Sequence, residues 1–165
     1  PSRYPGLLHG FLSALEDSKS VGEGTGWRPL YASISDSNQL IGAIVCYLKS
    51  DSYGEYVFDW AWADAYHRHG LNYYPKCVTS VPFTPATGPR VLIKDGYDKA
   101  RITQQLIETL RDELGDRVSS WHILFPDEES TQYIKPTGPW LERFGVQFHW
   151  FNQGFQSFDD HLATF

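Results

Sequence analysis

Residues 39–49 read QLIGAIVCYLK, and this nearly continuous apolar run decides the fold class. Such a run is typical of a strand that is covered on both faces. A shorter strand is expected just before it, at Leu30–Ser35. Residues 36–38 (DSN) between the two favour a tight turn, so we expect an antiparallel hairpin.

Helices and strands alternate on both sides of this hairpin. The clearest helical periodicity covers Tyr97–Leu114, with Asp98 suited to its N-cap and Gly115 to its end. The other expected helices are Leu7–Asp17, Trp60–His69, a region from Asp127 that ends at Trp140–Phe144, and Asp159–Phe165; the other expected strands are Lys76–Phe83, Ser120–Phe125 and Val146–Phe151. This order predicts an α/β (α+β) domain with a mixed sheet, because a hairpin is antiparallel whereas helical crossovers favour parallel pairing.

Composition restricts the function classes. A chain of 165 residues with 41% hydrophobic residues is expected to form one domain. A formal net charge of −6 argues against a surface for duplex nucleic acid. The sequence shows neither a membrane-spanning apolar run nor a signal peptide, so we expect a cytoplasmic protein without a transmembrane segment.

Two cysteines, Cys46 and Cys77, lie inside apolar, strand-like runs. We expect two buried thiols in a reducing compartment, although the sequence leaves a disulfide open. Neither cysteine belongs to a metal-binding motif, and we expect no metal site.

Residues 52–90 carry nine of the twenty-six aromatic residues of the chain. These rings are interleaved with ionisable side chains, among them Glu55, Asp59, Asp64, His67, His69 and Arg90. A core segment would be more aliphatic and less charged. Aromatic faces beside carboxylates and imidazoles suit a site for a polar, ring-bearing or sugar-like ligand.

Four phrases carry a family resemblance: TGWRPLY (25–31), SYGEYVFDWAWADAYHRHGLNYYPK (52–76), VPFTPATGPR (81–90) and QFHWFNQGFQSFDDHLA (147–163). Together they resemble a FemAB-like bacterial family of peptidoglycan biosynthesis or recognition, within the GNAT acyltransferase superfamily. The resemblance implies a GNAT-like acyl-CoA N-acyltransferase fold. It further implies that residues 1–165 form one lobe, the amino-terminal half of a longer, two-lobed protein.

The same resemblance implies an acyltransferase that moves an acetyl or aminoacyl group to an amine acceptor, such as a peptidoglycan precursor. Acetyl-coenzyme A or aminoacyl-tRNA would be the donor. The alternative is a non-catalytic lobe that recognises a glycan or peptide. In a third interpretation the aromatic surface packs against the missing lobe, and its exposure in this chain drives homodimer formation.

The expected donor loop departs from the GNAT pattern. Coenzyme A-binding members have a Gln/Arg-x-x-Gly-x-Gly/Ala loop, whereas residues 84–90 here read TPATGPR. Its two prolines have no N–H to offer a phosphate. Thr84, Thr87 and Arg90 are the candidates for binding the donor phosphate, and a rigid surface turn is the alternative.

Acyl transfer to an amine needs a base near the nucleophile. Glu55, Asp64 and His122 are the catalytic candidates. Asp64 and His67 are three residues apart and can meet on a helical turn, although a surface ion pair there and a helix cap at Asp59 are the alternatives.

The acceptor is expected to lie where strands Lys76–Phe83 and Ser120–Phe125 diverge. His122 and His149 each occupy the more polar face of an expected strand, so neighbouring strands would let the two imidazoles converge. The candidates for substrate binding are Asp59, Trp60, Trp62, Tyr66 and His149. In the recognition alternative, Tyr73 and Tyr74 add stacking surfaces.

Overall fold

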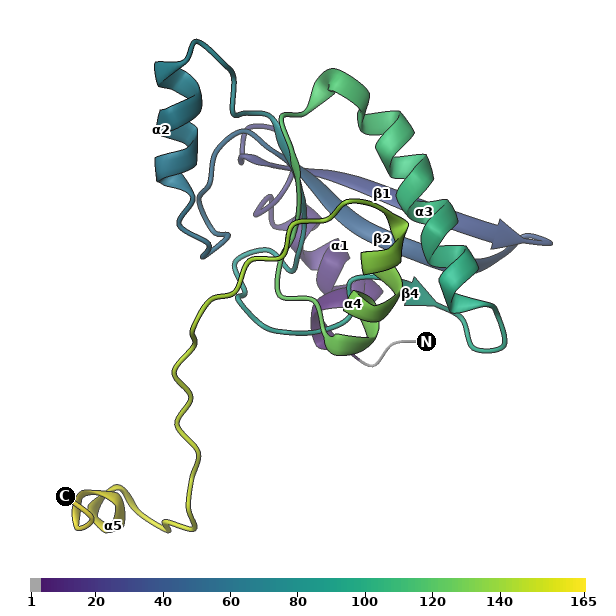
Figure 1. Ribbon diagram of the computed structural model, residues 1–165. Coiled ribbons are helices and arrows are strands. Elements are labelled where there is room, and N and C mark those ends of the chain that lie inside the picture. The colour runs from purple at the N-terminus through teal and green to yellow at the C-terminus, as the bar shows by residue number, and fades with distance from the viewer. Residues whose placement is uncertain (1–3) are drawn as a thin grey trace.

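A five-stranded mixed sheet forms the centre of the chain in the computed structural model, which describes residues 4–165 (Figure 1). Its strands are β1 (Trp27–Asp36), β2 (Gln39–Lys49), β3 (Lys76–Thr79), β4 (Leu92–Ile93) and β5 (Trp121–Ile123). The helices are α1 (His9–Asp17), α2 (Trp60–Arg68), α3 (Lys99–Leu114), α4 (Glu128–Ile134) and α5 (Phe158–Leu162), with short 3₁₀ turns at Pro5–Leu7, Gly115–Arg117 and Lys135–Thr137.

The strand order is β1-β2-β3-β5, and β4 also pairs with β2. The long hairpin of β1 and β2 is antiparallel, as predicted. β3 runs antiparallel to the end of β2, where Lys76 lies opposite Lys49. β3 and β5 are parallel, with Val78 opposite His122. The predicted mixed α/β architecture is therefore confirmed, and these two strands pair over residues 77–79 and 121–123.

One face of the sheet packs against α3. The helix begins at Asp98, whose carboxylate accepts a hydrogen bond of 3.0 Å from the backbone N–H of Arg101. Its apolar stripe is buried on the sheet, and Gly42 permits close approach, because a Cβ there would lie 2.5 Å from Cγ2 of Ile102. Cys46 and Cys77 lie in this core as free, buried thiols, as predicted.

The opposite face of the sheet is partly covered by α1. Alternate β2 residues point to opposite faces, so Val45 and Tyr47 face away from α3. They pack with Trp27, whose ring centroid lies 5.3 Å from that of Tyr47, and with apolar side chains of α1.

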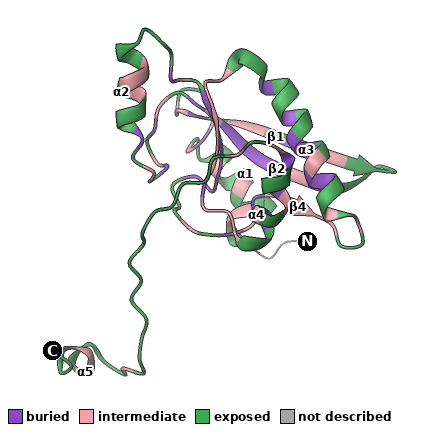
Figure 2. Cartoon of the chain, viewed as in Figure 1, coloured by how far each residue is buried: buried purple, intermediate pink, exposed green. Residues whose placement is uncertain are grey.

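The carboxyl-terminal segment differs from the prediction. Val146–Phe151 forms no strand, and Trp140–Phe144 is not helical. A strand needs a neighbour for its backbone N–H and C=O groups, and residues 146–151 instead run exposed and away from the sheet (Figures 1 and 2). Regular structure returns only at α5, where Ser157 and Asp160 form a reciprocal capping box.

Within residues 4–165, no helix combines the length and the apolar character needed to cross a bilayer.

Candidate functional site

Residues 52–60 show an inverted burial pattern. Ser52, Glu55 and Asp59 are buried, whereas the aromatic residues between and beside them are exposed: Tyr53, Tyr56, Phe58 and Trp60. The contrast is sharpest at neighbouring positions, since Phe58 is 77% exposed and Asp59 only 1%. Carboxylates are among the side chains least often buried and aromatic rings among the most, so another interaction must impose this arrangement.

That interaction comes from Lys76, the fully buried first residue of β3. Its Nζ lies 2.8 Å from Oε2 of Glu55, forms an ion pair with Asp59, and donates to Oγ of Ser52 at 3.0 Å. The hydroxyl of Tyr73 also donates to Asp59, at 2.6 Å. Asp59 occupies the expected N-cap position of α2, but its side chain makes no capping hydrogen bond and is bound to Lys76 and Tyr73 instead.

A second lysine binds the same segment. Lys49 lies opposite Lys76 in the β2–β3 register, and its side chain is also buried. Its Nζ contacts Oδ1 of Asp51 and the carbonyl oxygen of Tyr53, each at 3.2 Å. It also lies 3.9 Å from the ring centroid of Trp27, in cation–π geometry. Both lysines therefore attach residues 51–59 to the sheet.

The two carboxylates around Lys76 have opposite pKa shifts. Burial raises the pKa of Glu55. Burial alone would also raise the pKa of Asp59, but hydrogen bonds from Lys76 and Tyr73 and the positive charge of Lys76 outweigh it and lower this pKa to about 2. Asp59 is therefore negatively charged opposite Lys76 at neutral pH.

The backbone between the two acids is strained. Tyr56 has a φ of 60° and Phe58 a φ of 51°, in the left-handed region. This conformation costs roughly 1–2 kcal/mol for a residue with a Cβ atom. Gly54, with a φ of 77°, is needed for space as well, because a Cβ there would lie 2.6 Å from Cδ1 of Phe83.

Helix α2 carries further exposed aromatic residues. Trp60 and Trp62 are half-exposed, and the Trp60 ring meets Tyr53 edge-on at 5.0 Å between centroids. The guanidinium of Arg143 lies 6.0 Å from the Trp62 ring. Figures 1 and 2 show that this helix stands off the body with much of its surface exposed. We call Tyr53, Tyr56, Phe58, Trp60 and Trp62 the aromatic platform.

Two further predicted residues of α2 have structural partners. Asp64 forms an exposed ion pair of 2.9 Å with Arg68, not with His67. The ring of Tyr66 packs edge-on against Tyr73, with centroids 5.1 Å apart.

His122 and His149 lie on different segments and contact different residues. His122 is half-buried on β5, with Nε2 2.8 Å from Oγ of Ser120. Burial, followed by the nearby charge of Lys76, lowers the pKa of His122 to about 4, so the imidazole is neutral at pH 7. His149 lies on the exposed carboxyl-terminal segment, where it contacts Gln147 and stacks on Phe151. The strand that would have brought the imidazoles together does not form.

The predicted donor loop is organised around Arg90. Its buried guanidinium donates to three backbone carbonyls: Leu124 at 2.7 Å, Pro89 at 2.8 Å and Ala86 at 2.7 Å. Thr84 and Thr87 are exposed, and the Thr84 hydroxyl donates to the Pro82 carbonyl at 3.1 Å. Each nitrogen of the Arg90 guanidinium is thus already hydrogen-bonded within the protein.

A model of FemAB-like proteins, described as peptidoglycan biosynthesis/recognition, matches residues 2–165. The chain belongs to the FemAB-like family. This confirms the resemblance read from the sequence phrases. No curated protein and no solved structure matches the FemAB-like chain.

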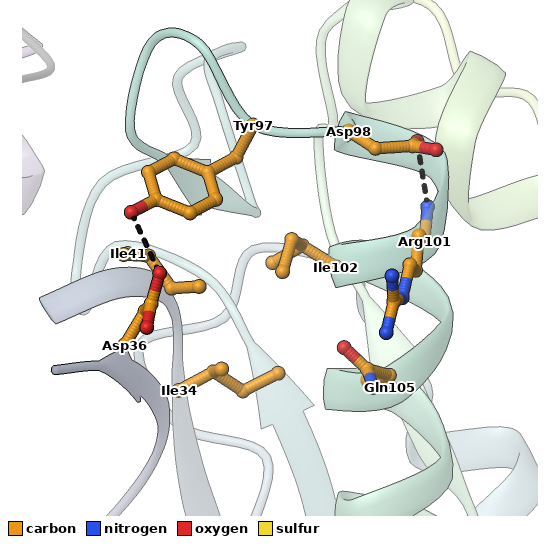
Figure 3. A pocket seen from close by; sticks show the side chains of 8 residues that line it. All are labelled: Ile34, Asp36, Ile41, Tyr97, Asp98, Arg101, Ile102 and Gln105. Atoms are coloured by element: carbon orange, nitrogen blue, oxygen red, sulfur yellow. Dashed lines mark hydrogen bonds between the residues drawn. The ribbon is translucent and has the colours of Figure 1, made fainter.

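A separate hollow of about 240 Å³ lies between the hairpin and the start of α3 (Figure 3). Its lining consists of Ile34, Asp36, Ile41, Tyr97, Asp98, Arg101, Ile102 and Gln105. The Tyr97 hydroxyl donates to Asp36 across it, at 3.1 Å. None of the residues predicted from the FemAB-like sequence lines this hollow. Within residues 4–165, no group of three His, Cys, Asp or Glu side chains is placed to bind a metal ion.

Sequence reasoning missed the two lysines that organise the FemAB-like site. Each stands at the end of an apolar strand, Lys49 closing β2 and Lys76 opening β3. A lysine inside such a run needs a buried partner, and the connecting segment offers four acids, of which Asp51 pairs with Lys49 and Glu55 and Asp59 pair with Lys76. The combination of buried lysines with nearby acids was the sequence signal that could have predicted this network.

Proposed function

We propose that this FemAB-like lobe recognises a peptidoglycan-type glycan, and that its aromatic platform stacks against the sugar rings. The observation that carries the proposal is the inverted segment 52–60, in which acids are buried and aromatic rings face solvent. Exposed aromatic surface held by a rigid base marks a binding surface. The apolar faces of sugar rings match such a surface, and the family description supplies the class of ligand.

Recognition is favoured over acyl transfer because the predicted bases are poorly suited to it. Glu55 is buried against Lys76, and Asp64 is an exposed partner of Arg68. His122, with a pKa of about 4, is a weak base at neutral pH, where an efficient general base has a pKa near 7. Arg90 is committed to backbone carbonyls and has little capacity left for a donor phosphate.

Acyl transfer is the second candidate, with a GNAT-like fold for this lobe. The hairpin, β3, α3 and the parallel β5 follow the order expected of that fold. The hydrogen bond between Ser120 and His122 is the observation that favours chemistry, since it orients the imidazole beside a hydroxyl with which it can exchange a proton. Incubation with acetyl-coenzyme A and an amino-sugar acceptor tests this candidate by mass spectrometry. An acetylated product that His122→Asn abolishes would support it.

Calorimetric titration with N-acetylglucosamine oligomers and muropeptides tests recognition. We expect saturable binding to the wild-type protein and its loss in the double variant Trp60→Ala/Trp62→Ala. Phe158→Ala is the matched control, because Phe158 is an exposed aromatic residue outside the aromatic platform. Equal binding by all three proteins, or no binding of any glycan by the wild type, would contradict the proposal.

A further inference from the structure

Tyr56 and Phe58 differ from the other rings of the aromatic platform. Tyr53 and Trp60 pack edge-on against each other. No ring contact is formed by Tyr56 or Phe58 with any residue among 4–165, and their side chains are 51% and 77% exposed. Their rings therefore receive little stabilisation from packing, although both backbones are held in the left-handed region.

A strained conformation persists only where its surroundings impose it. Here the imposing contacts lie on either side of the pair. Glu55 and Asp59 both enter the interior and meet the single ammonium group of Lys76. Closer to β2, Lys49 binds the carbonyl oxygen of Tyr53. Between these contacts the side chains of Glu55 and Asp59 point into the interior, and the side chains of Tyr56 and Phe58 point to solvent.

From these contacts we infer that Tyr56 and Phe58 contact the ligand, and that Lys76 is the positioning residue that holds their loop ready. The inference rests on the proposed function and names the rings that meet the glycan first. The ligand class is a saccharide with an apolar ring face, which can lie on the two unpaired aromatic rings. Because the loop is fixed before binding, little ordering is required when the ligand arrives.

The ligand contact is tested with Tyr56→Gly/Phe58→Gly, titrated with a chitin-type N-acetylglucosamine oligomer. Glycine adopts positive φ without strain, so this variant is compatible with the loop geometry and removes both rings. We expect the thermal midpoint to hold or rise and the affinity to fall about tenfold, as for the loss of one or two stacking contacts. Wild-type affinity in this double variant would overturn the assignment.

The positioning role is tested with Lys76→Met, and with Asp59→Asn, which keeps the side-chain size, if the first variant does not fold. The readout is chymotrypsin cleavage after Tyr56 or Phe58 under native conditions, together with glycan affinity. We expect faster cleavage in this loop and weaker binding, with the circular dichroism of the sheet and helices retained. A folded variant with a protected loop and unchanged affinity would overturn the role of Lys76.

The two proposals fail in different ways. If the wild type binds the glycan and Trp60→Ala/Trp62→Ala abolishes binding while Tyr56→Gly/Phe58→Gly does not, the proposed function stands and this inference falls. If the wild type binds no saccharide, both fall.

Discussion

Nζ of Lys76 lies 2.8 Å from Oε2 of Glu55, and neither side chain reaches solvent. Asp59 shares the same lysine. This single buried cation joins the sheet to the loop that carries the aromatic platform. A network of this kind is a doubtful source of net stability, because desolvation opposes the Coulomb attraction, but it fixes one geometry when all members are present.

Removal of Lys76 should therefore be costly. Lys76→Met leaves two carboxylates buried without their cation, and we expect the free energy of unfolding to fall by about 3–5 kcal/mol. Urea denaturation followed by circular dichroism measures the change. Lys99→Met is the matched control, since the ion pair of Lys99 with Glu129 lies at the surface and should contribute far less to the free energy of unfolding. Equal losses in the two variants would contradict the interpretation of the buried network.

His122 should make stability depend on pH in a defined window. Its pKa is about 4 when folded and 6.5 unperturbed, so the unfolded chain binds the proton more strongly. Its contribution is complete above pH 6.5 and is lost as the pH falls toward 4, by about 3 kcal/mol in total. His122→Asn should remove this loss.

The measurement is the difference in unfolding free energy between wild type and His122→Asn from pH 7 to pH 4. The pKa of Glu55 is raised, so its contribution to the free energy of unfolding decreases as the pH rises above 4.5. Both proteins contain Glu55, so this contribution cancels to first order in the difference between them. Asp59 loses its contribution only below pH 3.8. A difference that stays constant across the window would show that His122 titrates normally in the folded protein.

Arg90 should act as a structural residue. Arg90→Lys cannot supply the three hydrogen bonds to Leu124, Pro89 and Ala86, and we expect a loss of roughly 2–4 kcal/mol in unfolding free energy. Thermal-shift assays should show equally small effects of acetyl-coenzyme A on wild type and variant. Strong stabilisation of the wild type that disappears in Arg90→Lys would instead support the donor-phosphate role.

The parts of the fold that sequence predicts are those with strong periodicity. The apolar run of β2, the turn before it and the stripe of α3 each determine their own structure through burial. Val146–Phe151 has an equally suggestive pattern, but alternation does not supply the neighbouring strand that satisfies the backbone. Local patterns predict elements, and pairing decides which of them persist.

The candidate site was predicted as a region and not in its detail. The concentration of aromatic and acidic residues indicated the segment, but the two acids Glu55 and Asp59 were assigned the wrong environment. Glu55 and Asp59 were expected to face a ligand, and they face Lys76. This reversal depends on Lys76, which follows Glu55 by twenty-one residues and Asp59 by seventeen. No local periodicity encodes such a tertiary contact.

The most direct test of the account is a nuclear magnetic resonance titration of the ¹⁵N-labelled protein with an N-acetylglucosamine oligomer. The exposed rings of the inverted segment should make the first contact, so shifts should cluster at residues 53–62 and leave α3 unchanged. Shifts confined to the hollow around Tyr97 and Ile102, or an unperturbed aromatic platform at saturating oligomer, would contradict it.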